Sequence, residues 1–388
     1  MFTQRLQHAA VGGQEDVKNM TTFRAIGLMS GTSLDGMDAA FVETDGQNVI
    51  NVLAHAHHEF SSAEHMVHQQ AVDEARGFGK NNASIKKCAR LQSTLAASLV
   101  GKLTKEVGFS ADVIGFHGQT LLHEPDKAQT LQVGDADLLC QLTGIPVIHQ
   151  FRLADVKNGG QGAPLVPIYH QALLQNKNAK PSCMILNIGG VGNITYLGRR
   201  ELIAFDTGPG NGLMNDLAAV VLGAAFDQNG QLAASGRVHE DLVTAFLDHP
   251  YFDQLPPKSL DRHDFDIGFV RGLSSADAMA TLCAVTARCV VDGLRFLPEP
   301  PHTCFVAGGG RFNKTLMGML QQQLPFQVCP IEDVQLSSQG LESEAFAYLA
   351  VRFLKGLPSS FPSTTGCKEP TVAGTSVGAL NLVQRVIT

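Results

Sequence analysis

Apolar runs near the start of the chain predict three consecutive strands. They cover residues 23–29, 38–44 and 49–60, and only residues 45–48 separate the second run from the third. Connections this short join antiparallel neighbours. The pattern therefore predicts an antiparallel meander whose first turn is rich in glycine and serine.

A helix and two further strands are predicted after the meander. Apolar residues recur at three- and four-residue spacing over residues 84–107, which is the period of a helix. Short apolar runs at 113–116 and 145–151 predict buried strands. The first is followed by His-Gly-Gln-Thr at 117–120 and the second ends near Arg152, so polar side chains are expected at both strand ends.

The second half of the chain repeats the layout of the first, about 160 residues further on. Apolar runs at 183–188, 194–197 and 202–205 predict three strands, and a glycine turn at 189–193 joins the first two. A helix is predicted at 213–222. A duplicated unit predicts two similar lobes with a cleft between them, and ligand sites concentrate at such interfaces.

Three more segments complete the pattern. A run at 303–306 predicts a strand that ends in Gly-Gly-Gly-Arg-Phe-Asn at 308–313, ahead of a helix beginning near Lys314. Apolar residues four apart over residues 341–354 predict an amphipathic helix. Residues 248–266 are rich in Pro, Asp and His, which predicts an excursion on the surface.

The order of these elements suggests where the lobes begin and end. Residues 23–178 are expected to form lobe I and residues 179–340 lobe II. Residues 341–388 are expected to pack back on lobe I. Residues 1–22 are dominated by polar residues and glycine and are expected to form a flexible N-terminal extension.

Length, charge and cysteine content exclude several classes of protein. A chain of 388 residues can hold two cores. The net charge of −7 and the sequence pI near 6.0 argue against a nucleic-acid binder. No window approaches the roughly 18 apolar residues of a membrane span, and the N-terminus lacks a secretory h-region. The eight cysteines form no CxxC pair and are expected to be reduced in a cytoplasmic protein.

The turn at residues 27–38 suits both a phosphate group and a cation. Its Gly, Ser and Thr residues bring N–H and hydroxyl donors close to an anion. Asp35 and Asp38 in the same turn suit a bound cation or its waters. This combination points to nucleotide chemistry.

Three glycine-rich turns follow predicted strands in this chain. The turns at 27–38 and 189–193 would clamp a polyphosphate, and the turn at 308–313 would let a nucleoside lie against the start of a helix. A single turn of this kind often serves packing alone, but two at matching positions of a repeat favour a ligand. Neither a Walker pattern nor a dinucleotide-binding GxGxxG is present, which disfavours P-loop and Rossmann folds.

Asp206 is the leading candidate for a reactive carboxylate. It stands where an apolar strand meets the Gly-Pro-Gly turn at 208–210, so its side chain should project into the cleft and accept a proton from a water or hydroxyl. The alternative is that it merely caps that turn. Asp155 is the rival base, followed by Gly-Gly-Gln-Gly-Ala-Pro at 159–164, a loop that contacts a sugar or is only structural.

Three further residues are weaker candidates, each with a plain structural alternative. His117 could line the pocket or be a structural histidine. Arg152 could hold an acidic substrate group or lie on the surface. Glu342 could act in the site or only place a charge at a helix N-terminus. The chain has no HExxH zinc pattern and no GxSxG elbow, which removes those two templates.

Six motifs, in order along nearly the whole chain, resemble the signature set of the anhydro-N-acetylmuramic acid kinase family. They are GLMSGTSLDGMD at 27–38, HGQT at 117–120, GGQGAPLVP at 159–167, LNIGG at 186–190, FDTGPGN at 205–211 and GGGRFN at 308–313. The resemblance implies the α/β fold of sugar kinases, actin and chaperone ATPases. That fold has two RNase H-like lobes, with mixed sheets flanked by helices and ATP in the active-site cleft between them.

The resemblance also implies a reaction and site residues. Water would open 1,6-anhydro-N-acetylmuramic acid and ATP would phosphorylate O6, giving N-acetylmuramic acid 6-phosphate in peptidoglycan recycling. Asp206 would activate the water, and Gln119, Thr120, Arg152 and Glu342 would approach the sugar. Mg²⁺, whose ligands stay unknown, would accompany ATP, and the family is typically a homodimer. The implied nucleotide-binding residues are Gly31, Thr32, Ser33, Leu34, Asp35, Gly36, Met37, Asp38, Gly189, Gly190, Gly208, Gly210, Gly308 and Gly309.

Two alternatives on the same fold stay open at this point. A chaperone-like ATPase would normally add a separate peptide-binding domain, and little chain remains after Leu354. A kinase for an ordinary sugar hydroxyl is compatible with the composition. The motif at 159–164 favours the anhydro sugar.

Overall fold

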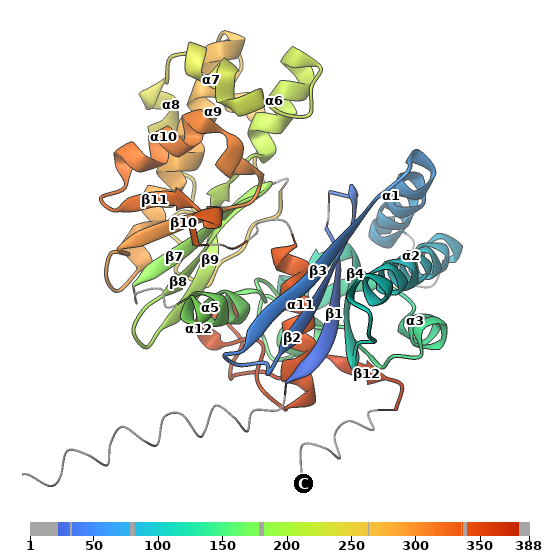
Figure 1. Ribbon diagram of the computed structural model, residues 1–388. Coiled ribbons are helices and arrows are strands. Elements are labelled where there is room, and N and C mark those ends of the chain that lie inside the picture. The colour runs from blue at the N-terminus through green and yellow to red at the C-terminus, as the bar shows by residue number, and fades with distance from the viewer. Residues whose placement is uncertain are drawn as a thin grey trace, which may run out of the picture.

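A computed structural model of the protein has two lobes, each built on one β-sheet (Figure 1). Lobe I carries the N-terminal sheet and lobe II the other. The predicted N-terminal extension lies outside the described residues except for Thr22, and so do residues 380–388 of the C-terminal segment. The structure describes residues 22–379 except residues 32, 78–81, 178–181, 263, 335 and 337–339.

The sheet of lobe I contains the predicted meander, which is confirmed. β1, β2 and β3 are antiparallel neighbours, and β4 and then β6 extend the sheet in parallel on the other side of β1. β5 pairs with β4, and β12 closes the edge beside β6. The strands are β1 (Phe23–Ser30), β2 (Gly36–Thr44), β3 (Ile50–Glu59), β4 (Val113–Glu124), β5 (Gln129–Val133), β6 (Val147–His149) and β12 (Thr375–Val377).

The sheet of lobe II repeats the arrangement of β1, β2, β3, β4 and β6 and has no counterpart of β5 or β12 among the described residues. β7, β8 and β9 form an antiparallel meander, and β10 and then β11 continue in parallel on the other side of β7. The predicted duplication and the mixed sheets of an RNase H-like lobe are therefore confirmed. The strands are β7 (Cys183–Ile188), β8 (Val191–Leu197), β9 (Leu202–Pro209), β10 (Thr303–Ala307) and β11 (Gln327–Pro330).

Helices cover both sheets on their outer faces (Figure 1). On lobe I, α2 packs on β2 and β3 with α1 and α3 beside it, and on lobe II α9 packs on β9 with the other helices around it. Within the described residues, no helix is long and apolar enough to cross a membrane. The helices are α1 (Ser62–Gly77), α2 (Ala83–Val107), α3 (Ala136–Thr143), α4 (Leu153–Lys157), α5 (Pro167–Asn176), α6 (Gly212–Leu222), α7 (Gln231–Ser235), α8 (Glu240–Leu247), α9 (Ser275–Gly293), α10 (Lys314–Gln323), α11 (Leu341–Leu354) and α12 (Pro362–Thr365).

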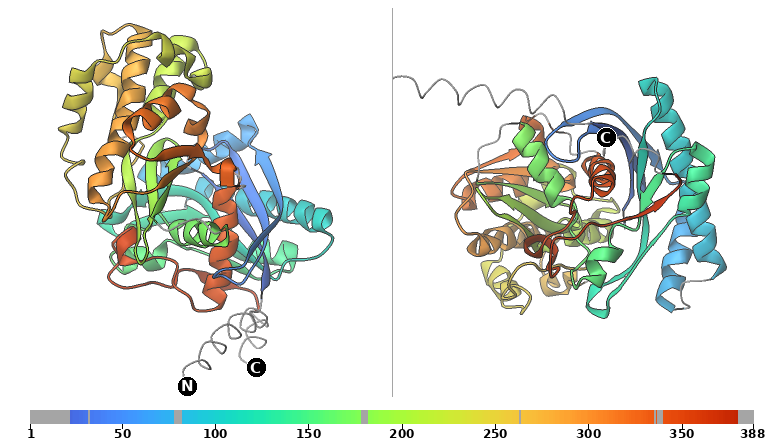
Figure 2. Two further views of the ribbon diagram at one scale, coloured as in Figure 1. Left: turned by 60° about the vertical axis from the view of Figure 1, so that its left-hand side comes forward. Right: turned by 90° about the horizontal axis from the view of Figure 1, so that it is seen from below.

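Helix α11 stands between the two sheets, as both views in Figure 2 show. The predicted helix is confirmed, but the expectation of one apolar face is wrong, because its side chains from Ser343 to Arg352 are all buried. Glycines of lobe I make room for it. A Cβ atom on Gly27 of β1 would lie 1.8 Å from the carbonyl oxygen of Ser343, and one on Gly115 of β4 would lie 2.0 Å from that of Phe346.

One hydrophobic core joins the lobes at the base of the cleft. It combines Phe23 from β1 with Ile185 from β7, Phe305 from β10, Tyr169 from α5 and Tyr348 from α11. Helix α5 touches strands of both sheets. Burial of this continuous apolar surface stabilises the lobes as one body around the cleft.

Three expectations about local structure need correction. The strand expected at 113–116 continues as β4 through Glu124, and the strand expected at 145–151 is only Val147–His149 long. The segment expected to be a surface excursion at 248–266 is partly buried, including Tyr251 and Phe252. Composition suggested exposure there, but the apolar side chains of the segment pack against α9 in a small core of their own.

Candidate active site

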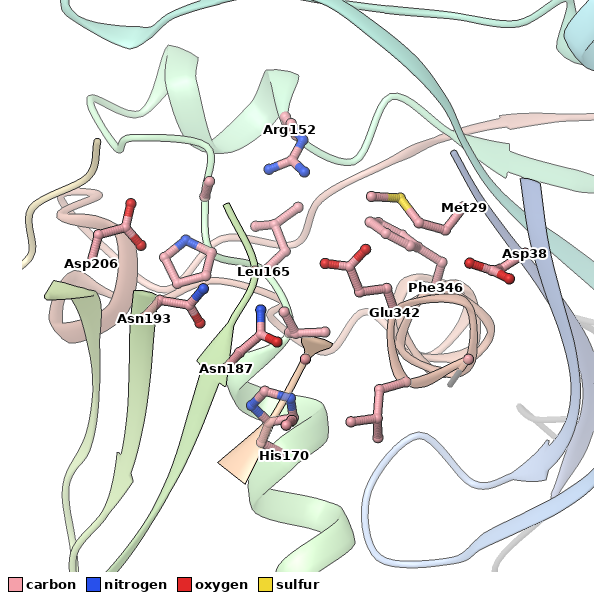
Figure 3. A pocket seen from close by; sticks show the side chains of 18 residues that line it. Met29, Asp38, Arg152, Leu165, His170, Asn187, Asn193, Asp206, Glu342 and Phe346 are labelled. Atoms are coloured by element: carbon pink, nitrogen blue, oxygen red, sulfur yellow. The ribbon is translucent and has the colours of Figure 1, made fainter. Parts of the chain in front are cut away.

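A cavity of about 430 Å³ lies between the lobes. Strands of lobe II form one wall, the N-terminal turn of α11 stands in the middle, and β1 and β2 form the opposite wall (Figure 3). The cavity is lined by Met29, Asp38, Arg152, Ala163, Pro164, Leu165, Val166, His170, Asn187, Gly189, Asn193, Asp206, Ala307, Gly308, Gly340, Leu341, Glu342 and Phe346.

Asp206 reaches this cavity from β9, at a point where the pairing with β8 shifts register. Its carboxylate oxygen Oδ2 accepts a hydrogen bond from the N–H of Leu260 at 2.9 Å, and no described residue donates to Oδ1. Burial raises the pKa of Asp206 to about 7, and the Leu260 N–H opposes that rise. Because its partner lies outside the turn at 208–210, the carboxylate does not cap that turn.

Asp155, the rival base, is sealed inside the protein. Its side chain is completely buried, and its two oxygens accept hydrogen bonds from the N–H of Gly162 at 2.6 Å and from the hydroxyl of Thr365 at 2.7 Å. A Cβ atom on Gly160 would lie 2.2 Å from Oδ2 of Asp155. The carboxylate therefore holds the glycine loop at 159–164 in place and has no access to the cavity.

Arg152 lies on the cavity wall, and two neighbours fix the direction of its guanidinium group. Its Nε donates to Nε2 of His117 at 3.0 Å and its Nη1 donates to the carbonyl of Gly162 at 2.7 Å. Burial lowers the pKa of Arg152 from its usual value, while the carboxylates of Glu342 and Asp155 raise it. The chain thus places one oriented cation in a cavity that carries several carboxylates.

Glu342 from α11 and Asp38 from β2 both line the cavity (Figure 3). The surrounding protein raises the pKa of Glu342, Arg152 opposes the rise, and Asp38 and Asp35 add to it. Asp38 is half-exposed, and its Oδ1 lies 2.8 Å from Nδ1 of His57. Both carboxylates are open to a ligand or to the waters of a cation.

The glycine turns of lobe II converge on one edge of the cavity. The N–H groups of Gly210 and Gly212 donate to the carbonyl of Gly190 at 2.9 and 3.1 Å, which ties the turn after β9 to the turn after β7. Gly308 has a φ of 77°, and a Cβ atom there would lie 2.5 Å from the carbonyl oxygen of Ile188. These close approaches require glycine.

Gly189 belongs to the same edge, and its position has a different consequence. A Cβ atom on Gly189 would meet only the carbonyl oxygen of Val191 at 3.8 Å and would otherwise enter the cavity. The space beside this backbone is therefore open. The N–H of Gly189 itself donates to the carbonyl of Val191 at 3.2 Å, so this position offers a ligand open space rather than a free donor.

The first glycine loop, between β1 and β2, is held by buried side chains. Leu34 is buried at a φ of 56°, and Met37 is also buried, so only their backbone could contact a nucleotide. Thr32 lies outside the described residues. Gly31, Ser33 and Asp35 form the open part of the loop.

Gln119 and Thr120 do not line the cavity in the described part of the chain. Gln119 is buried, donates to the carbonyl of Gly31 at 2.9 Å and accepts from the hydroxyl of Ser30 at 2.7 Å. Thr120 accepts from Gln132 at 3.3 Å on the strand pair β4 and β5. Their contact with a sugar stays a prediction, and the geometry gives Gln119 a contact with the first glycine loop instead.

Several lining residues were missed in the sequence, although many of them belong to the motifs given there. Asn187 precedes the glycine turn at 189–193 and Asn193 ends it, and both amides line the cavity. His170 comes from α5, and burial lowers its pKa to about 4. No local pattern marks His170, because its helix reaches the cavity only through the packing of the lobes.

The cavity combines an open glycine edge with carboxylates that come from different elements. Among the described residues, no three His, Cys, Asp or Glu side chains converge as a protein-built metal site. Mg²⁺ usually keeps several waters and is bound by one or two carboxylates together with substrate phosphates. Asp38 and Glu342 match this mode of binding, in which waters and phosphates complete the coordination, rather than a closed site built from protein ligands alone.

Comparison with known proteins finds relatives that match this chain over most of its length. The anhydro-N-acetylmuramic acid kinase of Rhizorhabdus wittichii is 45% identical over 368 residues, which cover 92% of this chain and 99% of the relative. The protein of the same name from Rhodopseudomonas palustris is 43% identical over 358 residues, covering 90% and 98%. Among solved structures, a gluconate kinase from Lactobacillus acidophilus aligns over 87% of this chain and 90% of its own, with 10% identity and a TM-score of 0.45.

A family model described as anhydro-N-acetylmuramic acid kinase matches residues 23–379. That range contains all six sequence motifs and every residue that lines the cavity. With identities of 43% and 45% over nine-tenths of the chain, the protein is an enzyme that belongs to the anhydro-N-acetylmuramic acid kinase family.

Proposed function

We propose that the protein uses ATP and water to convert 1,6-anhydro-N-acetylmuramic acid into N-acetylmuramic acid 6-phosphate. The sugar is the one named in the relatives from Rhizorhabdus and Rhodopseudomonas. The observation that carries the hydrolytic step is the carboxyl group of Asp206, which lines the cavity across from Glu342 and whose Oδ1 receives no hydrogen bond from a described residue (Figure 3).

Asp206 acts as a general base in this proposal. A water beside the free oxygen Oδ1 gives its proton to the carboxylate while the water oxygen bonds to C1 of the sugar. The bond between C1 and O6 breaks, and its electron pair stays on O6. O6 then bonds to the γ-phosphorus of ATP, ADP leaves, and the proton passes from Asp206 to solvent. A base whose pKa lies near the operating pH is suited to such a transfer.

Arg152 and Glu342 would hold the sugar. The sugar carries a carboxylate, and a guanidinium group binds a carboxylate through paired N–H donors. Nε and Nη1 of Arg152 are already engaged by His117 and Gly162, so the remaining N–H groups have a fixed direction. Glu342 offers an acceptor for a hydroxyl or amide of the same ligand.

The glycine loops would hold ATP between the lobes. The loop at 31–38 would take the phosphates from lobe I, and Gly189, Gly190, Gly208 and Gly210 would take them from lobe II, with Gly308 and Gly309 beside the nucleoside. Asp38 and Glu342 would hold Mg²⁺ through its waters. Bound there, Mg²⁺ would neutralise part of the phosphate charge, which is what phosphoryl transfer mainly requires.

The same proposal sets the reaction in peptidoglycan recycling in the cytoplasm, where ATP is available. The free state of all eight cysteines is compatible with a reducing compartment. A homodimer is part of the proposal. Light scattering on the purified protein tests it, and a mass of one chain would contradict it.

Product analysis in ¹⁸O-labelled water tests the reaction. With ATP, Mg²⁺ and the anhydro sugar, early product should carry ¹⁸O at C1 and phosphate at O6. Phosphorylation of an intact anhydro sugar would overturn the hydrolytic mechanism. Turnover only with an ordinary sugar, on a free hydroxyl and without label, would favour the simpler kinase.

A further inference from the structure

The segment from Tyr251 to Leu260 contacts Asp206 at three points. The hydroxyl of Tyr251 donates to the main-chain carbonyl of Asp206 at 2.6 Å. The N–H of Asp206 donates to the carbonyl of Lys258 at 2.9 Å. The N–H of Leu260 donates to the carboxylate oxygen Oδ2 at 2.9 Å. The segment therefore fixes both the backbone and the side chain of the proposed base.

Lys258 closes this segment on itself. Its ammonium group donates to the carbonyls of Tyr251 and Phe252 at 3.0 and 3.1 Å, while its own carbonyl binds Asp206. The ammonium group also lies over two aromatic rings, 4.5 Å from the centroid of Tyr251 and 4.7 Å from that of Phe296. One side chain thus links the start of the segment to its end.

Burying a lysine is costly, which makes its presence informative. Lys258 is only 6% exposed, and burial lowers its pKa to about 8. A buried cation loses the stabilisation of water, and an apolar residue of similar size often gives an equal or greater free energy of unfolding. Stability alone therefore does not account for a lysine at this position.

We propose that Lys258 is a positioning residue for the reaction. It holds the segment from Tyr251 to Leu260 so that the Leu260 N–H occupies Oδ2 of Asp206 and leaves Oδ1 for the water. This inference rests on the proposed role of Asp206 as the base. Lys258 does not touch the substrate; it acts through the two main-chain contacts and the Tyr251 hydroxyl.

The test compares Lys258→Met with the wild type and with Lys102→Met, an exposed lysine on α2. Lys258→Met should lower kcat by about tenfold or more, with the KM for ATP almost unchanged. The Leu260 N–H lowers the pKa of Asp206. Its loss should therefore move the acid limb of kcat/KM for the sugar to higher pH, by roughly half a unit or more. Lys102→Met should match the wild type.

A second variant decides the matter if Lys258→Met does not fold. Tyr251→Phe keeps the ring under the ammonium group and removes only the hydroxyl that binds Asp206. It should lower kcat severalfold and move the acid limb in the same direction. The positioning role is overturned if the folded variant keeps the acid limb of the wild type. It is also overturned if the loss of kcat is matched by an equal rise in the KM for ATP. A wild type without activity on the anhydro sugar would instead refute the proposed function.

Discussion

Arg152 and His117 are joined by a hydrogen bond of 3.0 Å from Nε of the arginine to Nε2 of the histidine. The other ring nitrogen, Nδ1, lies 2.7 Å from the carbonyl of Gly118 and must carry the proton, because a carbonyl can only accept. Burial and the charge of Arg152 lower the pKa of His117 well below its usual value. The imidazole is therefore a neutral acceptor that orients the guanidinium group.

Replacing His117 by Phe should weaken sugar binding more than catalysis. The ring of His117 packs 4.6 Å from that of Phe346, so a phenyl ring keeps the packing and removes the acceptor for Arg152 together with the Nδ1 donor to the Gly118 carbonyl. We expect the KM for the anhydro sugar to rise about tenfold, which matches the loss of one charged hydrogen bond, with kcat nearly unchanged. Steady-state kinetics measure both, with His65→Phe on the exposed face of α1 as the control. A fall in kcat at constant KM would contradict the role of His117.

Gln119 should affect ATP rather than the sugar. Its amide joins Gly31 to Ser30, and the hydroxyl of Ser30 also lies 3.0 Å from the carbonyl of Gly36, at the other end of the loop. Behind them, Gln92 donates to Ser30 at 3.4 Å and to His68 at 2.7 Å. The first glycine loop is thus supported by a buried polar network.

Gln119→Ala should raise the KM for ATP by about tenfold, because it leaves buried polar groups of the loop without a partner. The KM for the sugar should change by less than half that factor. Kinetics at saturating levels of each substrate in turn separate the two effects, and Gln69→Ala on α1 is an exposed control. If the KM for the sugar rises more than the KM for ATP, Gln119 belongs to the sugar site.

Gln119 was expected to contact the sugar but supports the first glycine loop, and this difference shows where sequence patterns stop being informative. Hydrophobic periodicity located the meanders and the helix at 341–354, because each pattern is local. Gln119 meets Ser30 across 89 positions, and Asp206 meets Leu260 across 54. No local pattern specifies such contacts, so the support of the first loop and the segment behind Asp206 were not foreseen. The extent of β4 was also missed, because Gly118, at a φ of 75°, interrupts the apolar run inside the strand.

Asp206→Asn should lose nearly all turnover and still bind ATP. Asparagine keeps the acceptor for the Leu260 N–H but cannot take a proton from water, so a loss of about a hundredfold or more in kcat is expected. Binding of ATP by calorimetry should stay within about twofold of wild type.

Asp155→Asn is the matched variant. It should lower the unfolding temperature, because Asp155 is buried between two donors, and the folded fraction should keep its kcat. Loss of kcat in Asp155→Asn together with retained kcat in Asp206→Asn would identify Asp155 as the base.

The activity of the wild type should depend on pH through Asp206. Burial raises its pKa from 3.8 to about 7, and only the deprotonated carboxylate can act as a base. The value of kcat/KM for the sugar should therefore rise with pH and level off above about pH 7. An acid limb near pH 4 would contradict Asp206, with its raised pKa, as the base.

The same shift predicts a dependence of stability on pH. Because the folded state binds this proton more tightly than the unfolded state, the contribution of Asp206 to the free energy of unfolding falls as pH rises from about 4 to 7. Asp206→Asn removes that loss, so the variant should unfold at a higher temperature than the wild type at about pH 8. Differential scanning calorimetry measures it, and a lower unfolding temperature would contradict the burial of the charge.

Gly27→Ala should displace α11 and, with it, Glu342. The added Cβ atom would lie 1.8 Å from the carbonyl oxygen of Ser343 and 2.4 Å from the nitrogen of Ala347, both of them backbone atoms that cannot turn away. We expect a loss of about 3 kcal/mol or more in the free energy of unfolding, at the large end for a single substitution. We also expect a raised KM for the sugar in the folded fraction.

Gly101→Ala is the control, because a Cβ atom there meets nothing within 4 Å on α2. That substitution should stabilise the protein by about 0.5–1 kcal/mol. Denaturant unfolding of the two variants measures the contrast, and equal stability would mean that α11 does not depend on its close approach to β1.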